Sequence, residues 1–488
     1  MKVGTVPVRR SRHSVGVSRG GGARSGGWGL LIAGLLWFLI LYLAIPADIF
    51  SPQTAAVGNA MAADWTSRLI KLGLLALSTL IVVKNRAAAW RLVRRINAFF
   101  LAFLALAALS YFWSISRPNT FARCLSLLCY LSVIVAFCVV GWHSRRFQKV
   151  VRPVVTLLLC ASLVFGIAEP SLAIEHAHGL ATLRDAWHGL TAQKNGFGQL
   201  AGFGTIFWLH AWLSKQVRTW AAVLFGGVSF TCLILSRSST SLLATVLSIC
   251  FLLLLLRSPH TFRRSIPYIT GLFAVIVVSF ALAMLDLVPF LRILLVPVVM
   301  LTGKNLTFSD RSAIWGIIKQ NIDLHPLLGG GFGAYWIGPV PSSPSYVFLN
   351  AMYFYPSESH NGYLEITNDL GMVGLVVLVG FLAVYLRQAL KLMKFDKTQG
   401  ALYLSLFFLQ AITNLTESTW LDVDAGFVLV VMTVATVALA RDLIEGERRA
   451  RARRALRAYA ASRNDGAGRA GRGPTARRNP GLIGSTRR

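Results

Sequence analysis

A small set of polar residues lies between long apolar segments and could carry chemistry. The set consists of Lys194, Asn195, Arg237, Arg311, His360, Asn361 and Glu417. An arginine guanidinium matches two phosphate oxygens at once, and a lysine adds a compact positive charge. An imidazole can accept a proton from a hydroxyl group near neutral pH. These residue types together favour a site that binds a lipid-linked phosphate or pyrophosphate and activates a sugar hydroxyl.

Each of these residues also has a structural interpretation, which the sequence leaves open. An arginine at the start of a helix is commonly an interface residue, and a lone histidine in a loop is commonly non-catalytic. Arg237 could anchor a helix end by extending its charged head to the membrane surface. Glu417 could simply pair with one of the basic residues.

Two further patterns are weaker indications of a metal site. His176, His178 and His188 share one segment, but their spacing fits no closed zinc pattern and no cysteine accompanies them. Asp422–Val423–Asp424 is a DxD sequence, which many soluble glycosyltransferases use to hold a metal ion and a nucleotide sugar. A match of three residues is not specific. No Gly-rich loop ending in Gly-Lys-Ser/Thr occurs either. We therefore predict no metal and no cofactor.

The composition predicts that membrane helices position the polar set. The chain is 55% hydrophobic and 14% charged, whereas soluble proteins carry about 25% charged residues. Apolar segments long enough to cross a bilayer recur, so we predict an all-α polytopic membrane protein with about twelve transmembrane helices. These helices are expected near residues 28–46, 69–83, 97–113, 122–141, 151–168, 196–213, 219–235, 241–256, 266–285, 370–390, 400–415 and 424–440. The first is expected to be retained rather than cleaved. The six cysteines all lie in apolar segments and are predicted to be small buried residues without disulfides.

The basic residues predict the orientation of these helices. The net charge is +30, and 38 of the 49 Lys and Arg residues fall on one side when the N-terminus is placed in the cytoplasm. Cytoplasmic loops of membrane proteins are enriched in Lys and Arg, so we favour this explanation over nucleic-acid binding. Both termini are then cytoplasmic, in a bacterial inner membrane, and the whole polar set lies on the periplasmic side.

The two ends of the chain have a different composition from the apolar region at 28–440. Residues 1–27 are rich in Gly, Ser and Arg and are predicted to be disordered. Residues 441–488 form a basic tail, of which the first part is compatible with a surface helix and the rest is predicted to be disordered. The positive charge of this tail favours contact with anionic membrane lipids.

The longest segment between predicted helices, residues 286–369, joins the ninth helix to the tenth. Ser309–Asp310 resembles a helix N-cap, and apolar residues at helical spacing follow Arg311. Arg311 would then lie in the first turn of a helix, where free backbone N–H groups favour anions. His325–Pro326 ends that helix, and a flexible turn is expected at 329–333. A second short helix is expected to start at His360–Asn361.

The polar segments, taken in order, resemble the bacterial O-antigen ligase and polymerase family, particularly its exopolysaccharide polymerases. The matching segments are Gln193–Gly196, Ser236–Ser238, Asp310–Trp315, Pro326–Gly333 and Ser359–Glu365. The resemblance covers a core at about residues 151–390. It does not extend to the N-terminal third or to the tail.

The resemblance implies a glycosyltransferase fold of the GT-C kind that acts without metal and inverts the anomeric carbon. The donor would be a glycan on undecaprenyl pyrophosphate. Arg311 matches the residue for the donor pyrophosphate, His360 the residue for the acceptor hydroxyl, and Arg237 a further arginine near the diphosphate. Lys194, Asn195 and Glu417 match recurrent polar positions. Together with Asn361, which adjoins His360, they are candidates for substrate binding.

The leading expectation is therefore an enzyme that polymerises lipid-linked repeat units into exopolysaccharide. A ligase that transfers the glycan to lipid A core shares the same donor chemistry and remains the main alternative. A transporter or flippase is less favoured, because the chain shows no two related halves and few ionisable residues deep in its helices. A non-catalytic scaffold is a further alternative. Expected partners are the lipid-linked glycan, membrane lipids, and other export and chain-length proteins.

Overall fold

The computed structural model describes residues 26–46, 65–140, 144–175, 185–258, 264–284, 311–352 and 355–422, with isolated positions between and after these ranges. The chain divides into two units, Met1–Ala438 and Leu439–Arg488. All elements described below belong to the first unit. The predicted disordered start, the N-cap at Ser309–Asp310, most of the predicted helix at 424–440 and nearly all of the tail lie outside the described residues.

Almost all regular structure in these ranges is helical. The helices are α1 (Gly26–Ala44), α2 (Trp65–Lys84), α3 (Arg86–Val93), α4 (Ala98–Leu109), α5 (Arg117–Val139), α6 (Ser144–Ala168), α7 (Pro170–Ala173), α8 (Lys194–Leu213), α9 (Thr219–Leu235), α10 (Ser239–Arg257), α11 (Ile266–Met284), α13 (Arg311–Leu324), α14 (Val347–Met352), α15 (Gly362–Met393) and α16 (Lys397–Thr413). Two short 3-10 helices span Ser110–Phe112 and Pro344–Tyr346. A two-stranded antiparallel sheet pairs β1 (Ile174–Glu175) with β2 (Ala186–Trp187).

The protein is an α-helical membrane protein. Within the described ranges, five helices are long and apolar enough to cross a bilayer: α2, α5, most of α6, α10 and α15. The pair α3 and α4, bent by 102°, would make a sixth span. Three shorter apolar helices lie in α1, α9 and α11. The predicted count of twelve spans therefore stays a prediction.

Most predicted helices occur close to their expected bounds, and α9 coincides with its prediction at 219–235. The basic segment between α2 and α4, expected to be a loop, contains helix α3. The sharp bend that follows is held by Asn97, which caps α4 and donates from Nδ2 to the Phe381 carbonyl at 2.9 Å. All six cysteines are free. Three of them are buried as predicted, whereas Cys124 and Cys160 are partly exposed and Cys250 is exposed.

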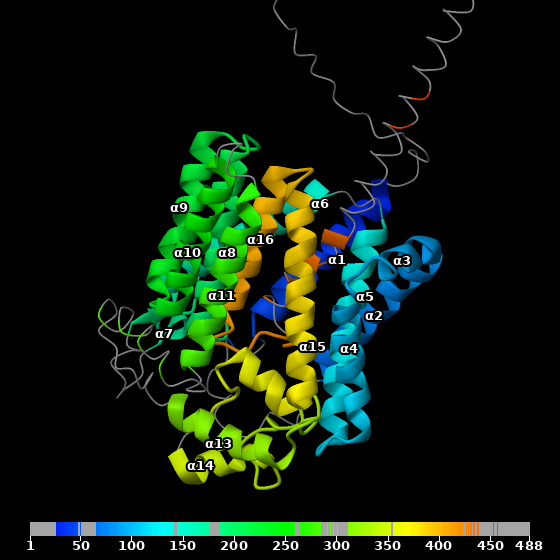
Figure 1. The fold of residues 1–488 in the computed structure, drawn as a ribbon, viewed down its shortest axis with the longest axis vertical. Helices are drawn as coiled ribbons and strands as arrows, with labels where there is room; N and C mark the ends of the chain where they lie inside the picture. Colours follow the sequence, from blue (N-terminus) through cyan, green and yellow to red (C-terminus); the bar gives the residue numbers. More distant parts are fainter. Residues whose placement is uncertain are drawn as a thin grey trace, which may run out of the picture. The chain divides into compact units, whose positions relative to one another are not determined.

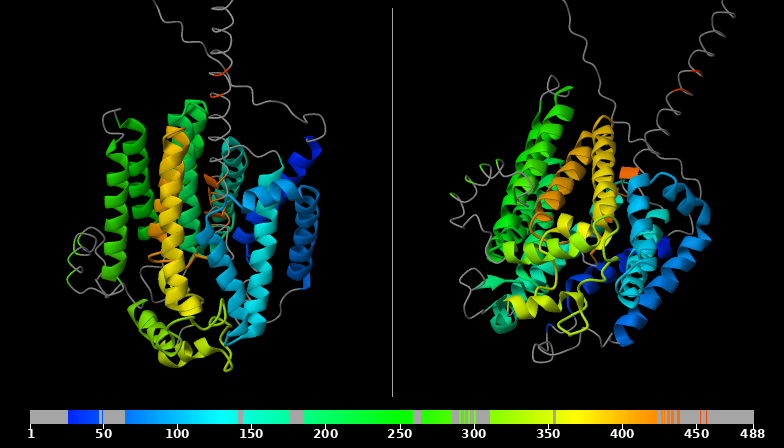
Figure 2. Two further views of the ribbon diagram at one scale, coloured as in Figure 1. Left: turned by 45° about the vertical axis from the view of Figure 1, so that its right-hand side comes forward. Right: turned by 60° about the horizontal axis from the view of Figure 1, so that its bottom comes forward.

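Helices α15 and α16 run side by side through the middle of the bundle. In the views of Figures 1 and 2, α8 to α11 lie on one side of this pair and α2 to α5 on the other. The two central helices pack on each other, α16 on α10 and α8, and α15 on α4. Lys397 donates to the carbonyl groups of Leu256 and Ser258, both at 2.9 Å. The basic segment that joins α15 to α16 therefore contacts the basic segment that follows α10. Helices α13 and α14 lie at the other end of the pair, where α15 begins (Figure 1).

Helix α13 packs over the start of α15 through an apolar core. Ile314, Trp315 and Ile318 are buried there against side chains that include Leu364 of α15 and Leu415, which follows α16. These three residues have the helical spacing predicted from the sequence. Their burial places the first residue of α13, Arg311, beside the loop that follows α16. The packing of this short helix thus determines where one predicted site residue lies.

The Gly-rich segment at 329–333 is buried and packs closely against the start of α15. Helix α15 is interrupted at Gly371, whose φ of +65° lies in the left-handed region. The break leaves backbone groups free to bond the neighbouring segment: Gly330 and Gly331 donate to the carbonyls of Asn368 and Asp369, each at 2.9 Å. The glycines therefore allow two backbones to approach, rather than providing the flexible turn that we expected.

Replacing Gly371 with alanine should destabilise the protein by about 3 kcal/mol or more. An added Cβ would lie 2.2 Å from the Leu327 carbonyl carbon, on a backbone conformation that alanine disfavours. Gly316→Ala is the matched control, because a Cβ there meets nothing within 4 Å and should stabilise α13 by up to about 1 kcal/mol. Thermal unfolding of the full-length protein in detergent measures both. Equal midpoints for the two variants would contradict this account of the packing.

Candidate functional site

Four charged side chains meet where α13, the start of α15 and the loop after α16 converge. Arg311 Nη2 lies 3.1 Å from Glu417 Oε1. His360 Nδ1 lies 3.7 Å from the other Glu417 oxygen and 3.0 Å from Glu358 Oε1. The Glu417 side chain is only 8% exposed, so Arg311 and His360 contact one buried carboxylate from two sides. We refer to Arg311, Glu358, His360 and Glu417 as the Glu417 cluster.

The backbone turn that presents His360 is held by Ser359. Trp315 of α13 donates from Nε1 to the Ser359 carbonyl at 3.0 Å. The Ser359 N–H donates to Glu365 Oε2 at 2.9 Å, and its hydroxyl lies 2.9 Å from that of Ser418. Ser359 is fully buried. Three separate elements therefore fix the residue immediately before His360.

His360 itself has a left-handed backbone, with φ of +51°. This conformation is uncommon outside glycine and is maintained only where the surroundings impose it. Here Asn361 follows at once as the N-cap of α15, accepting from the N–H groups of Tyr363 and Leu364 at 3.1 Å. Gly362 N–H in turn donates to the carbonyls of Asn414 and Glu417. The start of α15 and the loop that carries Glu417 are thus bonded directly.

Electrostatics give His360 a charge at neutral pH. Burial by itself lowers the pKa of an imidazole, because the charged form loses hydration. The carboxylates of Glu358 and Glu417 outweigh burial and raise the pKa of His360 to about 9. Nδ1 makes no hydrogen bond of good geometry with any described residue. Its 3.0 Å contact with Glu358 is therefore an ion pair. Two positive groups therefore face two carboxylates in the Glu417 cluster.

Glu358, His360 and Glu417 could also hold a metal ion, because one ligand atom of each lies within 4.8 Å of the others. Glu417 is already paired with Arg311, however, and a guanidinium keeps its proton in proteins. A divalent cation would add a further positive charge to a cluster whose charges are already balanced. The arrangement accordingly favours ion pairs over a metal centre.

The other sequence-predicted residues are placed differently. The Arg237 guanidinium lies 3.9 Å from Asp185, and both side chains are more than half exposed. Lys194 is the first residue of α8, and the Asn195 carbonyl accepts a long hydrogen bond of 3.4 Å from Ser241. Asn361 is fully buried as a helix cap. The structure therefore brings together Arg311, His360 and Glu417, whereas the interactions seen for the remaining four lie outside the Glu417 cluster.

Sequence reasoning missed one member of the cluster and two residues that donate hydrogen bonds to it. Glu358 was not singled out, although it stands two residues before His360. Gln193 Nε2 donates to one Glu358 oxygen and Ser418 N–H to the other, each at 3.3 Å. A carboxylate beside a candidate histidine was the available signal. Gln193 was noted only as part of the matching segment Gln193–Gly196, with no role assigned, and nothing indicated Ser418. These two residues come from distant loops.

A half-buried arginine within α5, Arg123, was also missed. Arg123 Nη1 forms a 3.0 Å ion pair with Asp422. This contact gives the first aspartate of the DxD sequence a partner in the protein. The second aspartate, Asp424, lies outside the described residues, as do His176 and His178. His188 Nδ1 lies 2.9 Å from the Thr191 carbonyl, which makes it a local loop contact.

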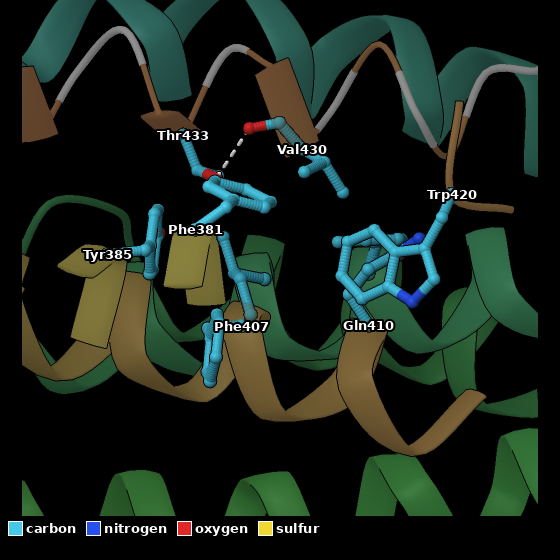
Figure 3. Close-up of a pocket in the computed structure, with 9 residues that line it drawn as sticks. Phe381, Tyr385, Phe407, Gln410, Trp420, Val430 and Thr433 are labelled. Carbon is cyan, nitrogen blue, oxygen red and sulfur yellow. Dashed lines mark hydrogen bonds between the residues drawn. The ribbon is translucent and has the colours of Figure 1, made fainter. Parts of the chain in front are cut away.

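Two hollows lie near these residues. The smaller, about 10 Å³, is lined mainly by aromatic and aliphatic side chains, together with Gln410 and Thr433. Figure 3 shows Phe381, Tyr385 and Phe407 around it. A water molecule needs at least about 10–15 Å³ of such space, so this gap is too small for a substrate. The larger hollow, about 250 Å³, is lined by Glu358 among others and adjoins the Glu417 cluster.

A family comparison covers much of this region. Residues 221–379 match the family model described as O-antigen ligase. The match runs from α9 into α15 and includes Arg237, Arg311, His360 and Asn361, while Glu417 follows its end. No curated protein matches the chain. By this match, and in keeping with the helical membrane architecture of the described residues, the region from α9 into α15 belongs to the O-antigen ligase and polymerase family.

Proposed function

We propose that the protein polymerises oligosaccharide repeat units carried on undecaprenyl pyrophosphate into an exopolysaccharide. The observation that supports this most is the Glu417 cluster, in which Arg311 and His360 flank one buried carboxylate. A guanidinium suits the diphosphate of the donor, and an imidazole suits the hydroxyl of the acceptor. The family supports a transfer reaction of this type.

In the proposed step, a hydroxyl oxygen of the acceptor sugar bonds to the anomeric carbon of the donor, opposite the leaving group. The bond from that carbon to the diphosphate oxygen breaks, and its electron pair stays on the diphosphate. The hydroxyl proton passes to His360. Because Nδ1 faces the carboxylates of Glu358 and Glu417, Nε2 is the atom that receives it. The anomeric configuration is inverted.

Arg311 would stabilise the negative charge that develops on the diphosphate. A guanidinium has five N–H donors in a planar fork, and the bond to Glu417 uses one nitrogen. The side chain is 22% exposed, which leaves the rest of the fork for a ligand. Fixed positive charge in a site shielded from water is effective because it needs no rearrangement during the reaction. Arg237, Lys194 and Asn195 are proposed to add further contacts to the donor, and Asn361 to fix the turn that presents His360.

We further propose that the helices form a GT-C type fold of about twelve spans in the bacterial inner membrane, with both termini in the cytoplasm. The Glu417 cluster would then lie on the periplasmic side, where lipid-linked glycans are displayed. The basic segment at Lys397 contacts the end of α10, and the Glu417 cluster lies at the opposite end of α15 and α16, which agrees with this orientation. Export and chain-length proteins would be partners in the same process.

A ligase that transfers the glycan to lipid A core is the second candidate, since the matching family model is described as O-antigen ligase. An assay with the purified full-length protein and a lipid-linked repeat unit as sole substrate separates the two. Chain growth without added core supports polymerisation. Product formed only when lipid A core is added would replace the polymerase proposal with the ligase.

The transfer rate should rise with pH, because only neutral His360 can accept the proton. With a pKa raised to about 9, the neutral fraction grows about tenfold per pH unit between pH 6 and 8 and levels off near pH 9. Glu358→Gln removes one carboxylate, lowers the pKa of His360 and should move the profile to lower pH. Initial rates across pH 6–10 test this. A flat profile, or a shift to higher pH in the variant, would argue against His360 as the base.

A further inference from the structure

The larger hollow next to the Glu417 cluster has a chemical character unlike that of a diphosphate site. Its walls include the carboxyl groups of Glu358, Glu365, Asp369 and Asp422, with Arg123 as the one basic side chain among its lining residues. Arg123 is already paired with Asp422. The one basic group of the lining is already engaged by Asp422, so the pocket offers a diphosphate no further positive charge to bind. The pocket is therefore poorly suited to the leaving group.

The remaining walls are aromatic. Phe332, Trp336 and Trp420 line the pocket together with the carboxyl groups. Trp336 is held in place, because its Nε1 donates to Glu365 Oε1 at 2.7 Å and its ring stacks on Phe348. Ligand sites commonly combine such aromatic walls with a few placed polar groups. A sugar ring presents C–H faces to aromatic planes and hydroxyl groups to carboxyl oxygens, so it fits both features.

Two polar atoms of the lining residues, Asp369 Oδ1 and Trp420 Nε1, lack a hydrogen-bond partner among the described residues. Asp369 is only 4% exposed, and its Oδ2 accepts from the Gly333 N–H at 2.7 Å. Its Oδ1 has no hydrogen-bond partner among the described residues. A buried polar atom left without a partner is unfavourable unless a ligand or water completes it. The hollow of about 250 Å³ exceeds the roughly 30 Å³ of one water several-fold, so a larger polar ligand has room.

We propose that this pocket binds an uncharged sugar residue of the glycan substrate. The proposal rests on the proposed function and adds a second subsite to it, separate from the one at Arg311. Glu358 belongs to both, since it lines the pocket and contacts His360 Nδ1. The sugar belongs either to the acceptor chain or to the donor repeat unit, because both present hydroxyl groups. A sugar bound in this pocket would contact Glu358, the carboxylate that pairs with His360.

The test uses the full-length protein in lipid nanodiscs and the repeat unit extracted on its lipid from cells that lack the protein. Mild acid releases the oligosaccharide from its diphosphate, and this released form can serve only as an acceptor. Its binding is followed by saturation-transfer NMR, which does not require transfer activity. The KM values for the released oligosaccharide and for the lipid-linked donor are then measured separately.

Asp369→Asn is the decisive variant, because the amide keeps one oxygen for the Gly333 N–H while replacing the unpartnered oxygen. We expect the affinity for the sugar to fall about tenfold or more, with kcat nearly unchanged. A rise in the acceptor KM alone assigns the pocket to the acceptor, and a rise in the donor KM alone assigns it to the donor. Asp323→Asn, on the exposed side of α13, is the matched control and should change neither value.

Asp422→Asn, at the more open side of the pocket, is the second variant and decides the question if Asp369→Asn does not fold. Unchanged binding and unchanged KM values in a folded variant would overturn the sugar subsite while leaving Arg311 and His360 in place. A wild-type protein that binds the released oligosaccharide but transfers nothing would overturn the proposed function and not the pocket.

Discussion

Arg311→Ala is expected to reduce the rate of glycan transfer by about 10²–10³-fold. The guanidinium is proposed to stabilise the charge that builds on the leaving diphosphate, and no other described group in the Glu417 cluster combines an obligatory positive charge with a forked set of donors. Initial rates with the lipid-linked repeat unit, measured on full-length protein in nanodiscs, give the loss. Arg311→Lys keeps the charge without the fork and should fall between the alanine variant and the wild type.

The alanine variant also has a structural effect, which must be separated from the chemical one. It leaves Glu417, only 8% exposed, without its partner, and breaking such a buried pair costs about 3–5 kcal/mol. The double variant Arg311→Gln with Glu417→Gln replaces the ion pair by two neutral amides of similar shape. It should unfold near the wild-type temperature and still fail to transfer. A double variant with the wild-type rate would remove Arg311 from the reaction.

Loss of His360 is expected to lower the transfer rate by about 10²–10⁴-fold, the usual contribution of a general base. The choice of substitution matters, because His360 has a φ of +51°. Asparagine accepts the left-handed region better than alanine does, so His360→Asn isolates the chemistry from backbone strain. The rise of the rate with pH should disappear in this variant together with the rate itself.

For His360→Asn, the pH profile of the rate distinguishes loss of the base from a folding defect. A defect in folding would lower the rate at every pH and keep the slope, whereas loss of the base removes the slope. Protein level in the membrane and the thermal midpoint complete the comparison. Normal polymer from both His360→Asn and the Arg311 double variant would leave a membrane protein of this family without the catalytic centre proposed for it, and would favour the scaffold interpretation.

Local sequence patterns predicted the elements around the site well. Residues 219–235 form α9 as expected, residues 311–324 are helical as expected, and Asn361 caps the helix predicted near it. Such features depend on short-range properties, namely apolar length, helical spacing and capping side chains. The break at Gly371 was beyond this reasoning. The predicted short helix and the predicted span at 370–390 form one element, α15, which is kinked at Gly371. The N–H groups that bond the backbone beside this kink come from the Gly-rich segment at 329–333.

The sequence by itself determined that this is a helical membrane protein whose polar residues are few, and it identified Arg311, His360 and Glu417 among them. Only the tertiary structure decided which of them meet. Glu417 could have paired with any of several basic residues, and helix packing placed it between Arg311 and His360. Glu358 and the Arg123–Asp422 pair emerged in the same way. Contacts between charged residues from distant segments depend on how the helices pack, and the spacing of residues along the chain does not predict that packing.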